Sequence, residues 1–424
     1  MRESAKIGRR IAGWNGPGDV NPRAEKTYGI SSKVLLLVNG LVRSYKAYSR
    51  NFVRLASVAR EYGTSVIVVG LDRPSADQVG SYLEGVRYRL VRKDRPLALV
   101  RLLLASLLEI VRSGAGIIVF GSLNTWSFPF YWLLLKVFRN RHVVYYMQDP
   151  VPESTAYLCV HRPQAVVKAR VWLQQLAERL AVDSASVLLV TCNDVLDAIG
   201  GRVDLSRVRI EVAWNTAGIA MLEQYGIPEV EELKRLKKKL RMGDGPKILY
   251  SGKQQRGVRG LEQQMRVLQR LLAVFPDVQL VITGHGEEQY FRSLANKLGL
   301  TRNVIWTGVL SDKDLAAIHY LCDLIILPPV PYILQSKFFD ALYAGIIPIV
   351  FYGSHDAIRI LGRDDLVYDG TDDSLFEVCC RILQDLRSYK AWVALKKSEV
   401  ATFVQKTRLA MMHALALPGR EEKG

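Results

Sequence analysis

The sequence predicts an α/β protein made of two Rossmann-like, doubly wound domains, each with a parallel sheet. One observation is the alternation of short apolar runs, typical of buried strands, with segments of helical periodicity. A second is that glycines and charged residues follow several of these runs, at the sheet edge where parallel sheets bind ligands. A third is the length of 424 residues, because one core rarely grows beyond about 250–300 residues.

The first half of the chain holds the strands of one predicted domain, placed at residues 31–218. Four apolar runs indicate buried strands: KVLLLVNG (33–40), TSVIVVGL (64–71), GIIVFGS (116–122) and HVVYYMQD (142–149). The last strands of this half are expected at 188–191 and 208–212. Residues 1–30 are polar, basic and glycine-rich, without the apolar core of a signal peptide, so we expect a disordered or loosely docked tail.

The second half repeats this pattern after a weakly patterned linker at residues 219–245, which contains a strongly basic helix. The second domain is placed at 246–385. Its strands are expected in KILYSG (247–252), VQLVIT (278–283) and DLIILPP (323–329), and its first helix begins at Leu261. Residues 386–424 should form C-terminal helices and a tail that pack outside the second domain.

Composition narrows the classes of partner. The formal net charge is +17, which suits nucleic acid, an anionic membrane surface or an anionic substrate. The basic residues are scattered and no common nucleic-acid module is visible, so we expect no nucleic-acid partner. The five cysteines lack CxxC spacing, which favours a reducing compartment and no structural zinc. No 18-residue stretch is free of charge, which argues against a membrane-spanning helix.

The loop KQQRGVRG (253–260) follows the first strand of the second domain and precedes a helix. Main-chain amides at such a turn attract anions, and Lys253 and Arg259 would add two charge-assisted contacts to a diphosphate. The Walker pattern is absent, so this is no ATPase loop of that type. A solvated basic loop is the alternative interpretation, and the sequence leaves both open.

The segment QSKFFDALYAG (335–345) carries a second group of candidate residues. Ser336 and Lys337 stand at a predicted helix start, where serine is a good cap and free amides face outward. Asp340 lies one turn later, where it could accept hydrogen bonds from sugar hydroxyls. A capped surface helix with an ordinary aspartate is the alternative.

Together these segments resemble the donor-binding domain of GT-B glycosyltransferases, in particular the large retaining family 4. Five motif pieces occur in the family's order: SGKQQRGVRG, ITGHG, NVIWTG, CDLIILPP and QSKFFDALYAGIIPIV. In the first half, YYMQDPVPES and VAWNTAG are similar to segments of the branch that builds bacterial surface polysaccharides. The resemblance implies a GT-B fold, in which the two domains face a cleft.

The resemblance also implies roles for individual residues. Lys253 and Arg259 match the cations that hold the donor diphosphate, and Asp340 matches the second acid of the E-x7-E motif, which binds the ribose. Further positions that match the donor-binding pattern are Asn39 and Gly40 in the first domain and Gly252, Gly284, Ser336 and Lys337 in the second. The first acid of the motif is missing, because Tyr332 stands in its place.

Asp149 is the nearest polar candidate for contact with the acceptor. The histidine that many members carry in the first domain is absent, and Gly121 to Asn124 occupy its place. Asp149 could equally cap a turn before Pro150. With Lys253 and Arg259 it completes the predicted catalytic set.

The expected activity is transfer of a sugar from a nucleotide-diphosphate sugar to a lipid-linked or glycan acceptor, with retention implied by the family alone. No DxD-like metal motif is evident, so we expect neither metal nor other cofactor. The helix at 96–113, with its narrow polar stripe, and the aromatic segment 126–141 could seat the enzyme on the anionic cytoplasmic face of the cell membrane. Two core helices are the alternative for these segments. Alternatives for the whole chain are a catalytically silent partner in glycan assembly and a GT-B sugar-nucleotide epimerase.

Overall fold

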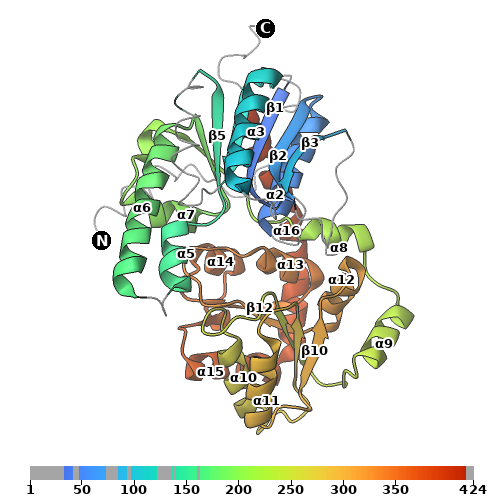
Figure 1. Cartoon of the computed structure of the whole chain (residues 1–424). Helices are drawn as coiled ribbons and strands as arrows, with labels where there is room; N and C mark the ends of the chain where they lie inside the picture. The colour runs from blue at the N-terminus through green and yellow to red at the C-terminus, as the bar shows by residue number, and fades with distance from the viewer. Residues whose placement is uncertain are drawn as a thin grey trace.

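A computed structural model describes residues 33–41, 47–72, 85–92, 97–121, 136, 140–159 and 163–416. These residues form two α/β domains stacked one above the other (Figure 1). Each domain contains one parallel sheet, with strand orders β3-β2-β1-β4-β5-β6-β7 and β10-β9-β8-β11-β12-β13. The predicted fold class of two doubly wound parallel-sheet domains is confirmed.

The first sheet is buried on both faces, as its near-continuous apolar strands require. Its strands are β1 (Lys33–Leu41), β2 (Ser65–Asp72), β3 (Arg87–Arg92), β4 (Ile117–Gly121), β5 (His142–Met147), β6 (Val187–Val190) and β7 (Arg209–Val212). Its helices are α2 (Ala47–Glu61), α3 (Ala98–Ser113), α5 (Val151–Leu158), α6 (Gln164–Asp183) and α7 (Asn193–Gly200). The two last strands lie within one residue of their predicted places.

The segment between the sheets contains a short helix, α8 (Ile219–Tyr225), and the basic helix α9 (Val230–Lys239). The predicted basic helix therefore exists, but it ends before Gly243 and Gly245. Leu236 is its buried anchor, and Lys313 of the second domain pairs with Glu232 at 3.0 Å. Helix α9 thus packs against the second domain while its cationic face points to solvent.

The second sheet repeats the strand–helix order of the first. Its strands are β8 (Lys247–Ser251), β9 (Gln279–Thr283), β10 (Val304–Gly308), β11 (Leu324–Ile326), β12 (Ile347–Phe351) and β13 (Val367–Tyr368). The helices are α10 (Leu261–Leu271), α11 (Glu288–Lys297), α12 (Asp312–Leu321), α13 (Ser336–Ala344), α14 (His355–Leu361) and α15 (Asp372–Gln384).

The last helix, α16 (Leu386–Leu415), differs from the prediction. We expected it outside the second domain, and its first turns do pack there through Tyr389 and Val393. Its last turns instead enter the core of the first domain, where Met411 and Leu415 are fully buried. The 30-residue helix is long enough to bridge both domains, at about 1.5 Å per residue.

The polar stripe predicted for the helix at 96–113 comprises Arg101, Glu109 and Arg112, and the prediction is wrong for Glu109. Glu109 faces inward, where it pairs with Arg87 and Arg89 of β3 at 2.8 and 3.0 Å. The outward face instead carries large aliphatic side chains that are 37–71% exposed: Leu97, Val100, Leu104, Leu107, Leu108 and Val111. Apart from Lys136, Asn140 and Arg141, the segment 126–141 lies outside the described residues. None of the described helices is long and apolar enough to cross a membrane.

Candidate functional site

The strand ends of the second domain are tied together by close contact between two loops. Gly252 follows β8 and Gly284 follows β9, and both have positive φ angles, 143° and 109°. A β-carbon on Gly284 would lie 2.3 Å from the carbonyl oxygen of Gly252. Gln254 and Gly286 form a parallel bridge between the same loops. Main-chain packing therefore explains the glycines of the ITGHG motif before any ligand is considered.

Two cations meet beside Gly252. A β-carbon at this position would lie 2.7 Å from Lys337 Nζ and 3.8 Å from the guanidinium Nη1 of Arg259. Lys337 also donates a hydrogen bond to the carbonyl oxygen of Ser251. The structure thus brings together three of the predicted donor-site residues, from the end of β8, the following loop and the first turn of α13.

The pKa of Lys337 is lowered to about 7. Its side chain is half-buried, and the surrounding protein atoms remove water from the ammonium group. This desolvation is the main cause of the lowered pKa. The neighbouring Arg259 lowers the pKa further, while Asp340 raises it. An anion placed between Lys337 and Arg259 would favour the charged ammonium, because opposite charges stabilise one another.

Lys253 and Ser336 occupy less central places. The Lys253 side chain is exposed, and its carbonyl accepts a hydrogen bond from the Tyr250 hydroxyl at 2.8 Å. Ser336 is the first residue of α13, whereas the N-cap is Gln335, which makes no side-chain cap. The expectation that Ser336 caps this helix is therefore wrong. A capping residue precedes the first helical residue, and Ser336 is itself the first helical residue.

Asp149 lies just beyond β5 of the first domain. Its side chain is exposed to solvent, yet protein atoms surround it closely enough to raise its pKa, which the charge of Arg259 lowers in turn. Asp149 and Arg259 therefore interact electrostatically across the two domains. Asn39 and Gly40 form an irregularity at the end of β1, where the register with β2 shifts between Val38 and Leu41; their side chains are outside the described set.

Asp340 is more enclosed than the sequence suggested. Only 7% of the residue is exposed, and its carboxylate fills the space beside Gly218, where a β-carbon would lie 2.2 Å from either oxygen. Gly218 belongs to the VAWNTAG segment that connects the domains. Asp340 thus touches both its own helix and the interdomain connection.

Gln148, Trp214 and Asn215 lie in the YYMQDPVPES and VAWNTAG segments, but the sequence predicted no role for them in this connection. Asn51 of α2 donates to Gln148 and to Asn215, each at 3.1 Å. Trp214 packs edge-on against Phe339 of α13 and Phe403 of α16, with ring centroids 6.2 and 5.2 Å apart. These residues are far apart in sequence and follow no spacing rule, so no local pattern could have revealed them.

Comparisons with known proteins agree with this architecture. Residues 233–354 match the family model described as "Glycosyl transferases group 1". HepE from Anabaena, solved with UDP and glucose, superposes with a TM-score of 0.65 at 15% identity over 88% of this chain and 97% of that chain. Sucrose-phosphate synthase from Thermosynechococcus elongatus gives a TM-score of 0.67 at 14% identity, covering 90% and 97%.

WaaG, a glycosyltransferase involved in lipopolysaccharide biosynthesis, is also similar in structure. Its TM-score is 0.63 at 15% identity, over 89% of this chain and 98% of that chain. A search of curated protein sequences found no match. At these identities the solved structures establish the fold, which is GT-B, and the segment that is similar to the glycosyl transferases group 1 model contains Gly252, Arg259, Lys337 and Asp340.

Proposed function

We propose that this protein transfers a sugar from a nucleotide-diphosphate sugar, which its second domain binds, to an acceptor held by the first domain. The observation that carries the proposal is the pair of cations beside Gly252, Arg259 and Lys337, inside the segment that matches the glycosyltransferase family model. Two converging cations suit a diphosphate, whose charge each of them can share.

The chemistry follows from where charge develops. The bond between the anomeric carbon and the diphosphate oxygen breaks, the acceptor oxygen bonds to that carbon, and the acceptor hydroxyl loses its proton. Arg259 and Lys337 would stabilise the charge that grows on the departing diphosphate, with Lys253 at the loop margin. This assignment requires no metal or other cofactor, and we include metal independence and retention at the anomeric carbon in the proposal.

Asp149 is the residue we assign to the acceptor side. The surrounding protein atoms raise the pKa of Asp149, which makes the carboxylate a stronger base, and Arg259 of the second domain lowers that pKa in turn. Asp149 would therefore contact the reacting hydroxyl or accept its proton.

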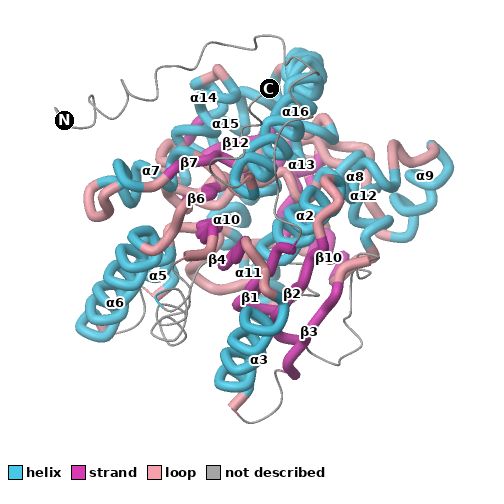
Figure 2. Tube along the Cα trace, turned by 90° about the horizontal axis from the view of Figure 1, so that it is seen from above, coloured by secondary structure: helices cyan, strands magenta, loops and turns pink. Residues whose placement is uncertain are grey.

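We further propose that the acceptor is a lipid-linked or glycan chain, met at the cytoplasmic face of the cell membrane. Two exposed apolar stripes support this part. The first is the leucine-rich outer face of α3, and the second lies on α6 and comprises Val166, Trp172, Leu173 and Leu176, which are 40–62% exposed. Both helices extend to the same side of the molecule (Figure 2), and exposed Arg101, Arg112, Lys168 and Arg170 accompany them. Apolar residues flanked by cations favour an anionic leaflet.

A ligand panel tests the enzyme proposal. We expect one nucleoside diphosphate among UDP, GDP, ADP and dTDP to raise the melting temperature, because a ligand at about 100 times its Kd stabilises a protein by about 2.7 kcal/mol. The shift should disappear in Arg259→Ala. Arg256→Ala is the matched control from the same loop, because Arg256 is engaged with Glu287 at 3.4 Å and with the ring of Tyr290 at 4.0 Å. A folded protein that responds to no nucleotide and shows no turnover would instead be the silent partner.

Vesicle flotation tests the membrane proposal. We expect binding to vesicles with anionic lipid, and Leu104→Glu should weaken it. Val274→Glu is the control, because Val274 of the second domain is 54% exposed and Leu104 is 55% exposed. Equal flotation of both variants and the wild type would remove α3 from the membrane contact.

A further inference from the structure

The N-termini of two helices from different domains lie against each other. Helix α7 of the first domain starts at Asn193, and α14 of the second starts at His355. The Asp356 carboxylate accepts hydrogen bonds from the main-chain amides of Asn193 and Asp194. In return, both carboxylate oxygens of Asp194 accept from the amide of Asp356, at 3.1 Å. Each helix therefore supplies the cap of the other.

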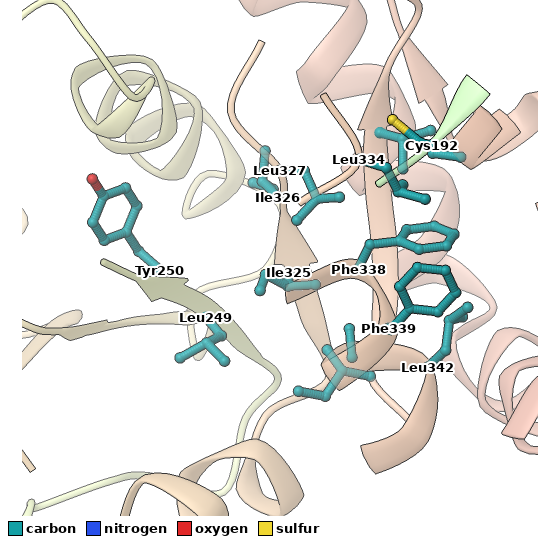
Figure 3. Close-up of a cluster of buried hydrophobic side chains, with 14 of the residues drawn as sticks. Cys192, Leu249, Tyr250, Ile325, Ile326, Leu327, Leu334, Phe338, Phe339 and Leu342 are labelled. Atoms are coloured by element: carbon teal, nitrogen blue, oxygen red, sulfur yellow. The ribbon is translucent and has the colours of Figure 1, made fainter. Parts of the chain in front are cut away.

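This contact is fully enclosed. Asp194 and Asp356 are 0% and 1% exposed, and Cys192 just before them is 0% exposed. Figure 1 shows α7 directly above α14 at the domain boundary, and Figure 3 shows Cys192 beside Leu334 of the second domain. The contact is thus part of a packed interface between the domains.

The two buried carboxylates need compensation for their like charges. First-turn amides of both helices supply part of it, since free amides at a helix start favour negative charge. Arg359 adds a contact to Asp356 at 3.0 Å, and the His355 ring lies 3.7 Å from Asp194. Main-chain amides and basic side chains therefore contact both carboxylates, and the two aspartates have a structural role between the domains.

We propose that Asp194 and Asp356 form an interdomain clamp that positions Asp149 of the first domain against Arg259 and Lys337 of the second. The link to Asp149 is short. Thr191, three residues before Asp194, donates its hydroxyl to the Gln148 carbonyl at 2.6 Å, and Asp149 is the next residue. The functional part of this proposal rests on the proposed glycosyl transfer, whereas the clamp itself does not.

Hydrogen exchange and small-angle scattering of the full-length protein test the clamp without any ligand. In Asp356→Ala we expect the amides of Asn193 and Asp194, which belong to the other domain, to exchange about 10-fold faster or more, because their local opening no longer breaks a hydrogen bond. The radius of gyration should rise as the domains separate more often. Asp356→Asn keeps one acceptor oxygen, so exchange at these two amides should rise by a smaller factor. This variant provides the test if Asp356→Ala folds poorly.

Thr371→Ala is the matched control. Thr371 caps α15 by accepting from the Ser374 amide at 3.1 Å, entirely within the second domain, so α7 exchange should remain at the wild-type rate. Unchanged exchange at residues 193–194 and an unchanged radius of gyration in folded Asp356→Ala and Asp356→Asn would overturn the clamp.

Turnover gives the functional readout. We expect Asp356→Ala to lower kcat by about 10-fold or more, since small misplacements of reacting groups are costly, while the Kd for nucleoside diphosphate changes less than about threefold. A wild-type kcat in a variant with faster α7 exchange would overturn the positioning role. Failure of the wild type to bind any nucleotide would instead contradict the proposed function. The hydrogen-exchange result would still test the clamp, because it needs no ligand.

Discussion

The ammonium group of Lys337 occupies the space beside Gly252 that a β-carbon would need, with Nζ 2.7 Å from that point. Real β-carbon contacts are not this short, so a larger residue at position 252 would force the end of the Lys337 side chain away from its place beside Arg259. The φ angle of 143° at Gly252 adds a second reason, because side-chain-bearing residues rarely adopt it. The cation pair and the glycine after β8 are therefore one structural unit.

Gly252→Ala should consequently impair the site as well as the fold. We expect a loss of about 1–3 kcal/mol in unfolding free energy from backbone strain, together with loss of the nucleotide-induced thermal shift. Gly299→Ala separates the two effects: Gly299 has φ 71° but nothing within 4 Å of its β-carbon position. That control should lose stability and retain the thermal shift.

Nucleotide affinity should depend on pH through Lys337. Its pKa is about 7, below the usual 10.5, so the ammonium is charged below pH 7 and loses its proton above it. A diphosphate prefers the charged form, and its Kd should therefore increase between pH 7 and 9, by at most about tenfold per pH unit. Lys337→Arg should flatten this dependence, because the guanidinium stays charged. Isothermal titration calorimetry between pH 7 and 9 measures the Kd for the wild type and for Lys337→Arg. An equal dependence of Kd on pH in the two proteins would contradict the role of Lys337 in diphosphate binding.

Asp340→Ala should reduce turnover by about 100-fold or more if the carboxylate orients the donor. It also removes the charge that supports the ammonium form of Lys337, so the pKa of Lys337 should fall further. Steady-state kinetics at saturating donor measures the effect. Wild-type turnover in a normally folded variant would show that Asp340 is structural.

Gly218→Ala should disturb Asp340 from the opposite side. The backbone of Gly218 is ordinary right-handed helical, with φ −76°, so alanine brings no conformational strain of its own. Its methyl group would lie 2.2 Å from the Asp340 oxygens, and such overpacking costs about 1–3 kcal/mol. Gly201→Ala is the control, because Gly201 has φ −77° and nothing within 4 Å. Only the first variant should weaken nucleotide binding in the thermal-shift assay.

Arg202→Ala should destabilise the first domain without touching the site. Arg202 joins Glu153 of α5 to Glu178 of α6, at 2.6 and 2.7 Å, and Glu178 is only 3% exposed. Removing the arginine leaves a buried acid without its counter-ion, at a cost of about 3–5 kcal/mol. Arg207→Ala should change little, since Arg207 is 83% exposed and pairs with the half-exposed Asp204.

The loss in Arg202→Ala should also depend on pH. Burial is the main cause that raises the pKa of Glu178, from 4.5 to about 7 in the folded protein. A folded-state pKa above the unfolded value means that the folded state binds more protons between these two pH values. Stability should then fall as pH rises through this window, and the fall should continue to higher pH in Arg202→Ala, because the charge of Arg202 no longer lowers the pKa of Glu178. Denaturant unfolding at pH 5 and pH 8 measures the difference.

The α/β class, the presence of two domains and most strands could be predicted from local patterns, because buried parallel strands leave continuous apolar runs bounded by glycine. Arg259, Lys337 and Asp340 could also be predicted as site residues, since each follows a recognisable strand end or helix start, and the structure places Arg259 and Lys337 together beside Gly252. Local patterns suffice where a residue's surroundings come from its own neighbours in sequence.

The contacts that these residues make with distant parts of the chain could not be predicted in this way. The contact between Asp340 and Gly218, and the mutual capping of Asp194 and Asp356, join residues more than 100 positions apart, and no periodicity encodes them. The inward turn of Glu109 is decided by two arginines on β3, and α16 crosses to the first domain because its last turns find an apolar core there. Such contacts depend on how the two domains come together, and that arrangement exists only once the chain has folded.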